Sequence, residues 1–407
     1  MKSIKSTIIG ISKIFFGSGL SQLLNFALVI VVTRMYGDSI LAYLVKVIAL
    51  SSFLVLFFEV GCNYLIISRS HKALKDILRI RLISWLLISV GYFAIFSVVK
   101  YFFTISFDAY FLCYIFSLLS SISNFFAYYY QGRGNIDKYA FSFFGRNSIH
   151  FLMTIILFYL FKPIDPISLW LTVGAVVNVV VIVFSLKDID RVLFSVRLDR
   201  TTLTTFRLSC YYLMSSLLVM VIIRAEAILL RNDDSQLAIY FQAKTFALAI
   251  SLISSSFSNY YLSNFNMVLE KGWRKFRNHV LYTYVMALPL LLPLFFFSDI
   301  IFHFLYSGEN AQQLRMIFTI VGFAFSLGII TNSLSTLLIK AEVSKVNFYL
   351  NLFQMALVII GGYLLVDFGI GALGVSIAVL MAHVSGFVII FLYTERKHDL
   401  LLKKIMD

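Results

Sequence analysis

The sequence predicts an all-α polytopic membrane protein with twelve transmembrane helices in two six-helix bundles. Three observations support this prediction: the hydropathy of the chain, the placement of its basic residues, and an internal repeat. The chain is 60% hydrophobic and 13% charged, and its mean hydropathy of +0.90 lies well above the soluble range. Apolar stretches of about 20 residues, the length that crosses a bilayer, follow one another along almost the whole chain.

The predicted spans start directly after a basic N-terminal segment. The first span is long, and no small-residue cleavage site follows it. We therefore expect it to be retained as the first helix and not to be removed as a signal peptide. In the ninth span, Pro289 and Pro293 each lack an amide donor, which predicts a bend. The spans are 12–34, 39–63, 82–100, 107–130, 140–161, 166–186, 208–230, 237–262, 279–305, 314–338, 346–367 and 370–394.

Lys and Arg collect in every second gap between these spans. Most of the chain's 34 basic residues lie at the two termini and in alternate connections, such as Arg69–Arg81 and Lys187–Arg207. Because basic residues near helix ends stay cytoplasmic, both termini are predicted inside and the protein is expected in a bacterial inner membrane. The net charge of +14 is explained by this signal and by attraction to anionic lipids. No basic face is interleaved with aromatics, so no nucleic-acid partner is expected.

A short sequence recurs about half a chain length later. Each copy leads from an odd-numbered span into the next and is followed by a lysine, Lys46 or Lys244. The repeat predicts a first bundle over 1–190, a cytoplasmic linker over 191–206 and a second bundle over 207–407. Six spans per half give both halves the same topology, so a pseudo-twofold axis along the membrane normal is expected. The shared residues are Asp38, Ser39, Leu41 and Ala42 in the first copy, and Asp234, Ser235, Leu237 and Ala238 in the second.

Several ionisable residues interrupt the apolar spans. Such groups are costly in hydrocarbon and usually face a bundle interior or a hydrated cavity. Lys46, Arg224 and Lys244 lie at similar depths, roughly 10 Å from the predicted outer ends of their helices, and Glu226 shares this level. The alternative is snorkelling to the outer headgroups. Arg34, at the outer end of the first span, is expected either to face the cavity or to cap its helix, whereas Glu59 and Arg146 are expected at the cytoplasmic interface.

Uncharged polar residues form stripes at helical spacing on several spans. They predict the wall of a hydrated cavity, although small polar residues also mediate ordinary helix packing in lipid. The candidate cavity residues are Gln22, Asn25, Asn124, Tyr128, Ser251 and Ser255.

Signals for catalysis and metal binding are weak. The six histidines and three cysteines have no metal-ligand spacing, so neither a catalytic residue nor a metal site is predicted. No Walker motif is present, which argues against direct use of ATP. The sequence therefore indicates a secondary transporter and not an enzyme, and no cofactor is expected. The expected coupling ion is H⁺ or Na⁺, and Glu226 is the candidate group for coupling or charge balance.

Four short motifs carry a family resemblance: Thr33-Arg34-Met35-Tyr36-Gly37, Glu59-Val60-Gly61, Tyr130-Gln131-Gly132 and Ile239-Tyr240. With them, the chain resembles the O-antigen and polysaccharide flippases of the multidrug/oligosaccharidyl-lipid/polysaccharide exporter superfamily. The resemblance implies alternating access that moves an undecaprenyl-pyrophosphate-linked oligosaccharide from the cytoplasmic to the periplasmic leaflet, for lipopolysaccharide biosynthesis. It implies that Lys46, Arg224, Lys244 and Arg34 bind this substrate. Spans two and eight carry lysines, not arginines, at these positions, and a lysine cannot make the bidentate contact with phosphate that an arginine makes.

Two alternatives remain at this stage. A multidrug or cation antiporter of the same fold is disfavoured by a cavity rich in basic residues. A membrane O-antigen polymerase, an enzyme, is disfavoured because no large external loop is present. The partners expected for a flippase are the lipid-linked oligosaccharide, the lipid bilayer, a polysaccharide polymerase and a chain-length regulator.

Overall fold

The computed structural model is helical at every regular element that it describes, which confirms the predicted fold class. Among the residues that it describes, eleven helical stretches are long and apolar enough to cross a membrane, and they coincide with every predicted span except the eighth. At the eighth position lies α12 (Asp234–Ser263), a helix of 30 residues and therefore about 45 Å long. The described residues are 2–68, 71–103, 105–133, 135–188, 200–263, 272–306, 310–340 and 343–406.

The helices form two compact units. Unit 1 comprises Met1–Ser39 and Val221–Asp407, and unit 2 comprises Ile40–Met220. These units differ from the two bundles predicted from sequence at α1 (Lys2–Tyr36), which belongs to unit 1, and at α10 (Arg200–Ile223), most of which belongs to unit 2. The predicted linker 191–206 lies mostly outside the described residues, and the pseudo-twofold axis remains a prediction.

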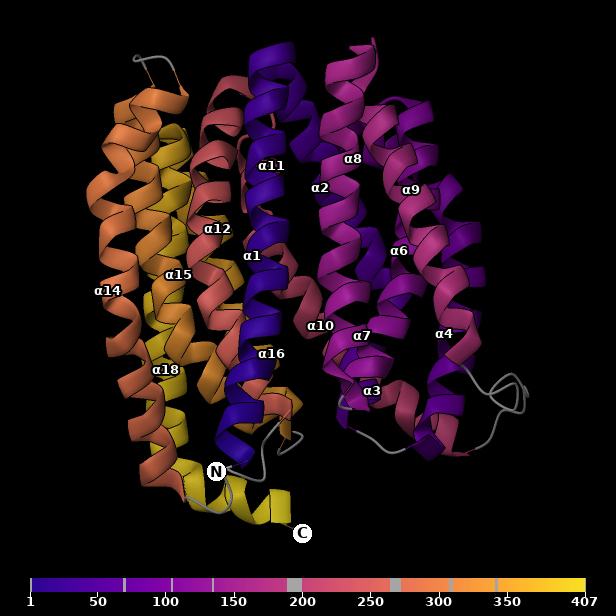
Figure 1. Cartoon of the computed structure of the whole chain (residues 1–407), viewed down its shortest axis with the longest axis vertical. Coiled ribbons are helices and arrows are strands. Elements are labelled where there is room, and N and C mark those ends of the chain that lie inside the picture. The colour runs from indigo at the N-terminus through magenta and orange to yellow at the C-terminus, as the bar shows by residue number, and fades with distance from the viewer. Residues whose placement is uncertain are drawn as a thin grey trace. The chain divides into compact units, whose positions relative to one another are not determined.

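In unit 1, α15 is packed between α12, α14 and α18, and α1 lies along α12 (Figure 1). An apolar cluster that includes Trp273, Phe276, Leu334 and Leu401 packs α14, α15 and α18 together at one end of the unit. The two chain ends lie at this same end of the unit (Figure 1). Besides α1 and α12, the unit contains α11 (Ala225–Leu229), α14 (Trp273–Leu305), α15 (Ala311–Lys340), α16 (Ser344–Ala356), η4 (Leu357–Gly361), α17 (Gly362–Asp367) and α18 (Gly371–Met406).

In unit 2, α6 is the central helix and packs on α9 and α3. Aromatic residues on α6, including Phe125, Phe126 and Tyr129, fill the apolar cluster between these helices. Besides α10, the unit contains α2 (Asp38–Glu59), α3 (Cys62–Ser68), α4 (His71–Ala94), α5 (Phe96–Phe103), α6 (Phe107–Gly132), α7 (Ile136–Ala140), the π-helix η1 (Phe141–Gly145), α8 (Arg146–Phe161), α9 (Pro166–Ser185) and the 3₁₀ turn η2 (Leu186–Asp188).

Two of the short motifs are explained by backbone geometry. Gly37 has a φ of +82°, and its N–H donates to the Thr33 carbonyl over 3.0 Å, which is how a left-handed glycine ends a helix such as α1. Val60 and Gly61 both have positive φ, +50° and +65°, at the corner between α2 and α3. A Cβ on Gly61 would lie 2.3 Å from the Ser209 carbonyl oxygen, so only glycine permits α10 to approach this closely.

The internal repeat has the same structural role in both copies. Asp38 is the first residue of α2, and Asp234 is the first residue of α12. A carboxylate at this position interacts favourably with the helix dipole. Each helix then carries its lysine about two to three turns further on: Lys46 follows Asp38 by eight residues, and Lys244 follows Asp234 by ten.

Candidate functional site

A buried ion pair lies in unit 1 beside a break in the helical backbone. The Lys244 Nζ atom on α12 lies 2.7 Å from Glu226 Oε1 on α11, and the two side chains are 3% and 0% exposed. The same ammonium group donates to the carbonyl of Ile223. Two members of the predicted cavity set, Lys244 and Glu226, are therefore in direct contact.

The backbone break explains why this carbonyl needs a partner. The helix α10 ends at Ile223, Arg224 has φ −110° and ψ 20°, and α11 starts at Ala225. A carbonyl in the last turn of a helix has no intrahelical partner, and in hydrocarbon an unsatisfied one costs several kcal/mol. Lys244 satisfies the Ile223 carbonyl and balances the charge of Glu226 at once. Broken helices of this kind line the substrate and ion sites of many transporters.

Two of the predicted cavity residues in unit 1 each have a buried oxygen without a described hydrogen-bond partner. Glu226 Oε2 is buried and has no hydrogen-bond partner among the described residues, and neither has Gln22 Oε1 on α1. Arg224, at the break itself, is half-buried. The Lys244 Nζ atom also lies 5.8 Å from the ring centroid of Tyr240, within the range of a cation–π contact. Tyr240 belongs to the Ile239-Tyr240 motif.

Arg34 lies in unit 1 as well, but it caps a helix. Its guanidinium Nη2 donates to the carbonyl of Leu305, the last residue of α14, over 3.1 Å. Nearby, Gln242 Nε2 donates to Thr33 Oγ1 over 3.2 Å and to Asp38 Oδ1 over 3.3 Å, which ties α12 to the turn after α1. The Thr33–Gly37 motif is thus bound both to α12 and to the end of α14.

The other predicted cavity residues are distributed over both units. Lys46, on α2 of unit 2, is buried with 5% exposure. Asn25 and Tyr128 are half-buried. Ser251 Oγ donates to the Leu248 carbonyl of its own helix over 2.7 Å, and the side chain of Ser255 lies outside the described side chains. A site that joins Lys46 to Lys244 and Arg224 remains a prediction.

A second buried polar cluster, centred on Glu59, lies in unit 2. Glu59 Oε1 accepts from Asn124 Nδ2 over 2.7 Å, and Glu59 Oε2 accepts from Asn63 Nδ2 over 2.6 Å. The two amide oxygens in turn accept from arginines: Asn124 Oδ1 from Arg146 over 2.9 Å, and Asn63 Oδ1 from Arg81. Each amide therefore bridges one guanidinium and the shared carboxylate by hydrogen bonds.

This cluster shows that neighbouring helices cover Glu59 and Arg146. The two side chains are only 4% and 6% exposed, and Arg81 is fully buried; their place at the level of the cytoplasmic interface remains a prediction. Arg81 Nη1 also donates to the Ser121 carbonyl over 3.3 Å. Asn63 has no charge or motif that distinguishes it in the sequence, and Arg81 was attributed to the orientation signal. The five side chains come from five helical elements of unit 2, so the cluster fixes how these elements pack.

Comparison with known proteins identifies the fold. No protein-family model matches the chain, and no curated protein matches it in sequence. Among solved structures, a MATE transporter in complex with MaL6 is 14% identical, with a TM-score of 0.67 and 97% of each chain covered. An inward-facing multidrug resistance MATE family transporter of the MOP superfamily is 15% identical, with a TM-score of 0.63 over 94% of this chain and 96% of that one.

The lipid II flippase MurJ, in an inward closed conformation, is 18% identical, with a TM-score of 0.63 over 98% of this chain and 90% of that one. At these identities the likeness establishes the fold alone. The chain thus has the fold shared by MATE transporters and a lipid flippase, as the resemblance of its motifs to this superfamily predicted. The O-antigen flippase subfamily remains a prediction.

Proposed function

We propose that the protein is a flippase that moves an undecaprenyl-pyrophosphate-linked oligosaccharide, such as an O-antigen repeat unit, from the cytoplasmic to the periplasmic leaflet. The observation that supports this proposal is the sign of the buried charge. Among the described residues, five cationic side chains are buried and three carboxylates are buried. The cations are Lys46, Arg79, Arg81, Arg146 and Lys244, and the carboxylates are Glu59, Asp76 and Glu226.

An excess of positive charge inside a membrane protein favours an anionic substrate. A pyrophosphate cannot cross hydrocarbon without charge compensation, and a charge-assisted hydrogen bond to a lysine or arginine contributes more there than in water. The polyprenyl tail needs no such compensation because it can stay in lipid. In this proposal Lys46, Arg224 and Lys244 receive the pyrophosphate, and Arg34 contributes positive charge at the end of α1.

Glu226 has the charge-balancing role in this proposal. While no substrate is bound, Lys244 is neutralised by Glu226. A pyrophosphate that attracts Lys244 leaves Glu226 available to bind H⁺ or Na⁺, and its second oxygen has no partner among the described residues. Transport is secondary in this scheme, and the protein spans a bacterial inner membrane with both termini in the cytoplasm. A polysaccharide polymerase and a chain-length regulator would act on the product.

The competing function is multidrug or cation antiport, which the MATE likeness also supports. A cationic drug would meet repulsion from the excess of buried cations, whereas a pyrophosphate would not. The two functions therefore differ in the charge of the ligand that the purified protein binds.

The experiment that tests the proposal compares three ligands. Purified protein in detergent is titrated with undecaprenyl pyrophosphate, undecaprenol and the cationic dye ethidium, and binding is read from intrinsic tryptophan fluorescence. The proposal expects pyrophosphate to bind at least about tenfold more tightly than the alcohol, because one charge-assisted contact contributes about this factor. Ethidium binding that is competed by other organic cations, with no preference for the pyrophosphate, would overturn the proposal in favour of antiport.

A further inference from the structure

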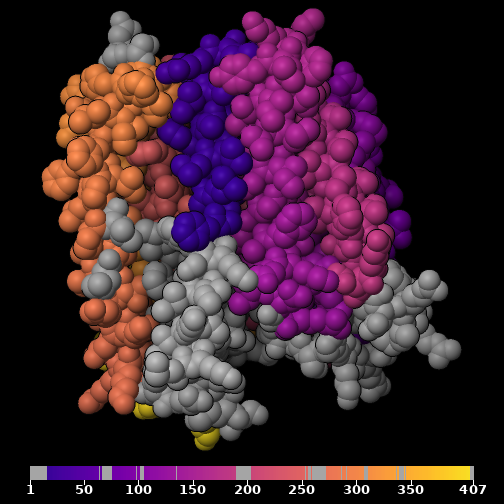
Figure 2. Space-filling model, in the orientation of Figure 1, coloured from indigo at the N-terminus to yellow at the C-terminus, as the bar shows by residue number. Residues whose placement is uncertain are grey.

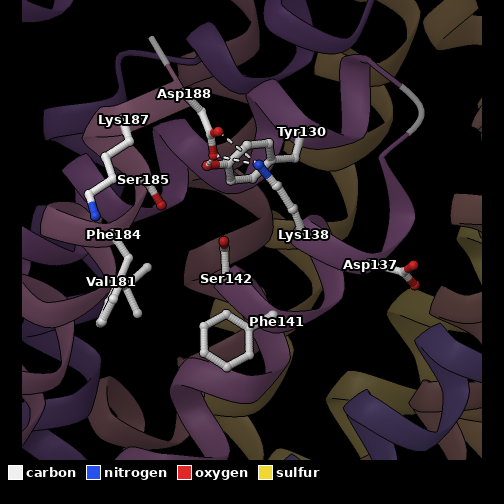
Figure 3. A pocket seen from close by; sticks show the side chains of 10 residues that line it. All are labelled: Tyr130, Asp137, Lys138, Phe141, Ser142, Val181, Phe184, Ser185, Lys187 and Asp188. Atoms are coloured by element: carbon white, nitrogen blue, oxygen red, sulfur yellow. Dashed lines mark hydrogen bonds and ion pairs between the residues drawn. The ribbon is translucent and has the colours of Figure 1, made fainter.

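A cavity of about 410 Å³ opens in unit 2 where α6 and α7 meet the end of α9 (Figure 3). It lies between connections that carry the basic residues of the predicted cytoplasmic side. Neither the proposed substrate site nor the Glu59 cluster uses its side chains. Its walls come from α6, α7, η1, α9 and η2, and the residues are Tyr130, Asp137, Lys138, Phe141, Ser142, Val181, Phe184, Ser185, Lys187 and Asp188.

One wall is a fixed polar triad. The Lys138 Nζ atom lies 2.8 Å and 2.7 Å from the two carboxylate oxygens of Asp188, and the Tyr130 hydroxyl donates to Asp188 Oδ2 over 2.6 Å. Asp188 thus holds the lysine ammonium in place. An ammonium group has three N–H donors, so Lys138 keeps donor capacity beyond these bonds.

A second lysine, Lys187, also lines the cavity, together with a second carboxylate, Asp137. Lys187 follows Ser185 by two residues, is exposed, and makes no hydrogen bond or ion pair with the part of the chain that the structure describes. The Asp137 carboxylate points away from the other labelled side chains (Figure 3). Lys138 is paired with Asp188, so Lys187 is the lining cation that has no counter-charge among the labelled side chains (Figure 3). The Ser142 hydroxyl adds a short donor, whereas the Ser185 hydroxyl is bonded to Tyr130. This donor set matches a phosphate group with a single negative charge.

The remaining wall is apolar and faces outward. Phe141 on η1 and Phe184 on α9 are 55% and 64% exposed, which is unusual for phenylalanine unless lipid covers it. The helices α8 and α9 continue from this wall as one surface of unit 2 (Figure 2). Their exposed side chains include Leu152, Ile156, Val176 and Val180, so the surface beside the cavity remains apolar. A free phosphate ion needs no such surface, but an acyl chain does.

We infer that this cavity binds the headgroup of an anionic phospholipid, with its phosphate on Lys187, Lys138 and the Ser142 hydroxyl. The acyl chains lie against Phe141, Phe184 and the outer faces of α8 and α9. Basic pockets between membrane helices on the cytoplasmic side bind anionic headgroups in this way. The bound lipid would also cover the π-helix η1, whose widened turn presents both Phe141 and Ser142 to the cavity.

The experiment measures lipid binding to the full-length protein in detergent by native mass spectrometry. Phosphatidylglycerol, phosphatidylethanolamine and diacylglycerol are added in turn, and inorganic phosphate is added to a sample that contains phosphatidylglycerol. Wild-type protein should retain phosphatidylglycerol preferentially, and Lys187→Ala should weaken its binding about tenfold because one charge-assisted contact is lost. Lys187→Arg should restore binding because the positive charge is restored.

The matched control is Lys397→Ala, which removes one exposed lysine from α18 in unit 1 and should leave binding unchanged. Equal phosphatidylglycerol binding by wild type and Lys187→Ala would overturn the inference. Equal retention of phosphatidylethanolamine and phosphatidylglycerol would overturn the choice of an anionic headgroup. Displacement of the lipid by millimolar inorganic phosphate would indicate a site for the free ion instead. None of these outcomes depends on the transport substrate.

Discussion

Replacing Glu226 by glutamine should destabilise the protein strongly, because it leaves the Lys244 ammonium buried without a counter-charge. The two side chains are 0% and 3% exposed and 2.7 Å apart, so solvent screens neither. Removing one partner of a buried pair costs about 3–5 kcal/mol, whereas replacing both by uncharged residues of similar volume is often nearly neutral. Lys244→Met should cost a similar amount, and the double variant much less than the sum.

The assay is a double-mutant cycle on the free energy of unfolding, measured by denaturant titration in mixed micelles. The expected coupling energy between Glu226 and Lys244 is at least about 3 kcal/mol, since the double variant removes both uncompensated charges. If the single variants are too unstable to purify, recovery of folded protein in the double variant is the same result. The matched control is the exposed pair Lys138–Asp188, also 2.7 Å apart but 48% and 33% exposed, where the coupling should be about 0.5 kcal/mol.

Additivity at Glu226 and Lys244 would refute the reasoning. If the two single effects sum to the double effect within about 0.5 kcal/mol, the residues do not interact in the folded protein. A coupling as small as that of Lys138 and Asp188 would mean that water screens the pair. Either result would remove the physical basis for exchanging Lys244 between Glu226 and a pyrophosphate.

Four further predictions concern the proposed site, the packing of unit 2 and the orientation of the chain. Arg224→Ala should lose most transport of the lipid-linked oligosaccharide while Arg224→Lys retains part, because charge survives without the guanidinium fork; equal transport by both variants, at equal protein level, would exclude a role in binding. Gly61→Ala should destabilise by about 3 kcal/mol or more, since its φ is +65° and a Cβ would lie 2.3 Å from the Ser209 carbonyl; Gly91→Ala, where a Cβ meets nothing within 4 Å, should be neutral or stabilising by up to about 1 kcal/mol. Asn124→Leu should lower the free energy of unfolding by about 3 kcal/mol, because Glu59 and Arg146 both lose a buried hydrogen bond; an unchanged unfolding midpoint would contradict this. In a cysteine-free background, Lys397→Cys should be labelled only from the cytoplasm and Lys162→Cys only from the periplasm; the reverse pattern would invert the predicted orientation.

The sequence was sufficient for the fold class because hydropathy and helix length are local properties. It also placed Lys244 and Glu226 at one depth, since depth follows from counting residues along a helix. It could not pair them, because the contact depends on the break at Arg224 and on the packing of α11 against α12. Neither feature leaves a periodic signal in the chain.

The burial of the Glu59 cluster could not be predicted from the sequence. Glu59 and Arg146 were expected at the interface because each lies toward the predicted cytoplasmic end of a span. Depth along one helix does not determine whether neighbouring helices cover a side chain, and here α3, α4 and α6 do so. Arg81 was attributed to the orientation signal because a basic residue near a span end fits that signal equally well. Asn63 carries no charge, and no adjacent residue in the sequence identifies it as part of a polar cluster.

The Glu59 cluster also has a consequence for biosynthesis. Its members are made in the order Glu59, Asn63, Arg81, Asn124 and Arg146, so the carboxylate and the amide acceptor precede the last arginine. An arginine near the middle of a membrane span costs about 2.5–3.5 kcal/mol on insertion scales, and Arg146 lies well inside the span Ile136–Phe161. When this span leaves the ribosome, Asn124 is already in the membrane as a partner for that guanidinium. Insertion of the fifth span should therefore be efficient only in chains that already carry the first four, and a fusion reporter placed after residue 161 would measure that dependence.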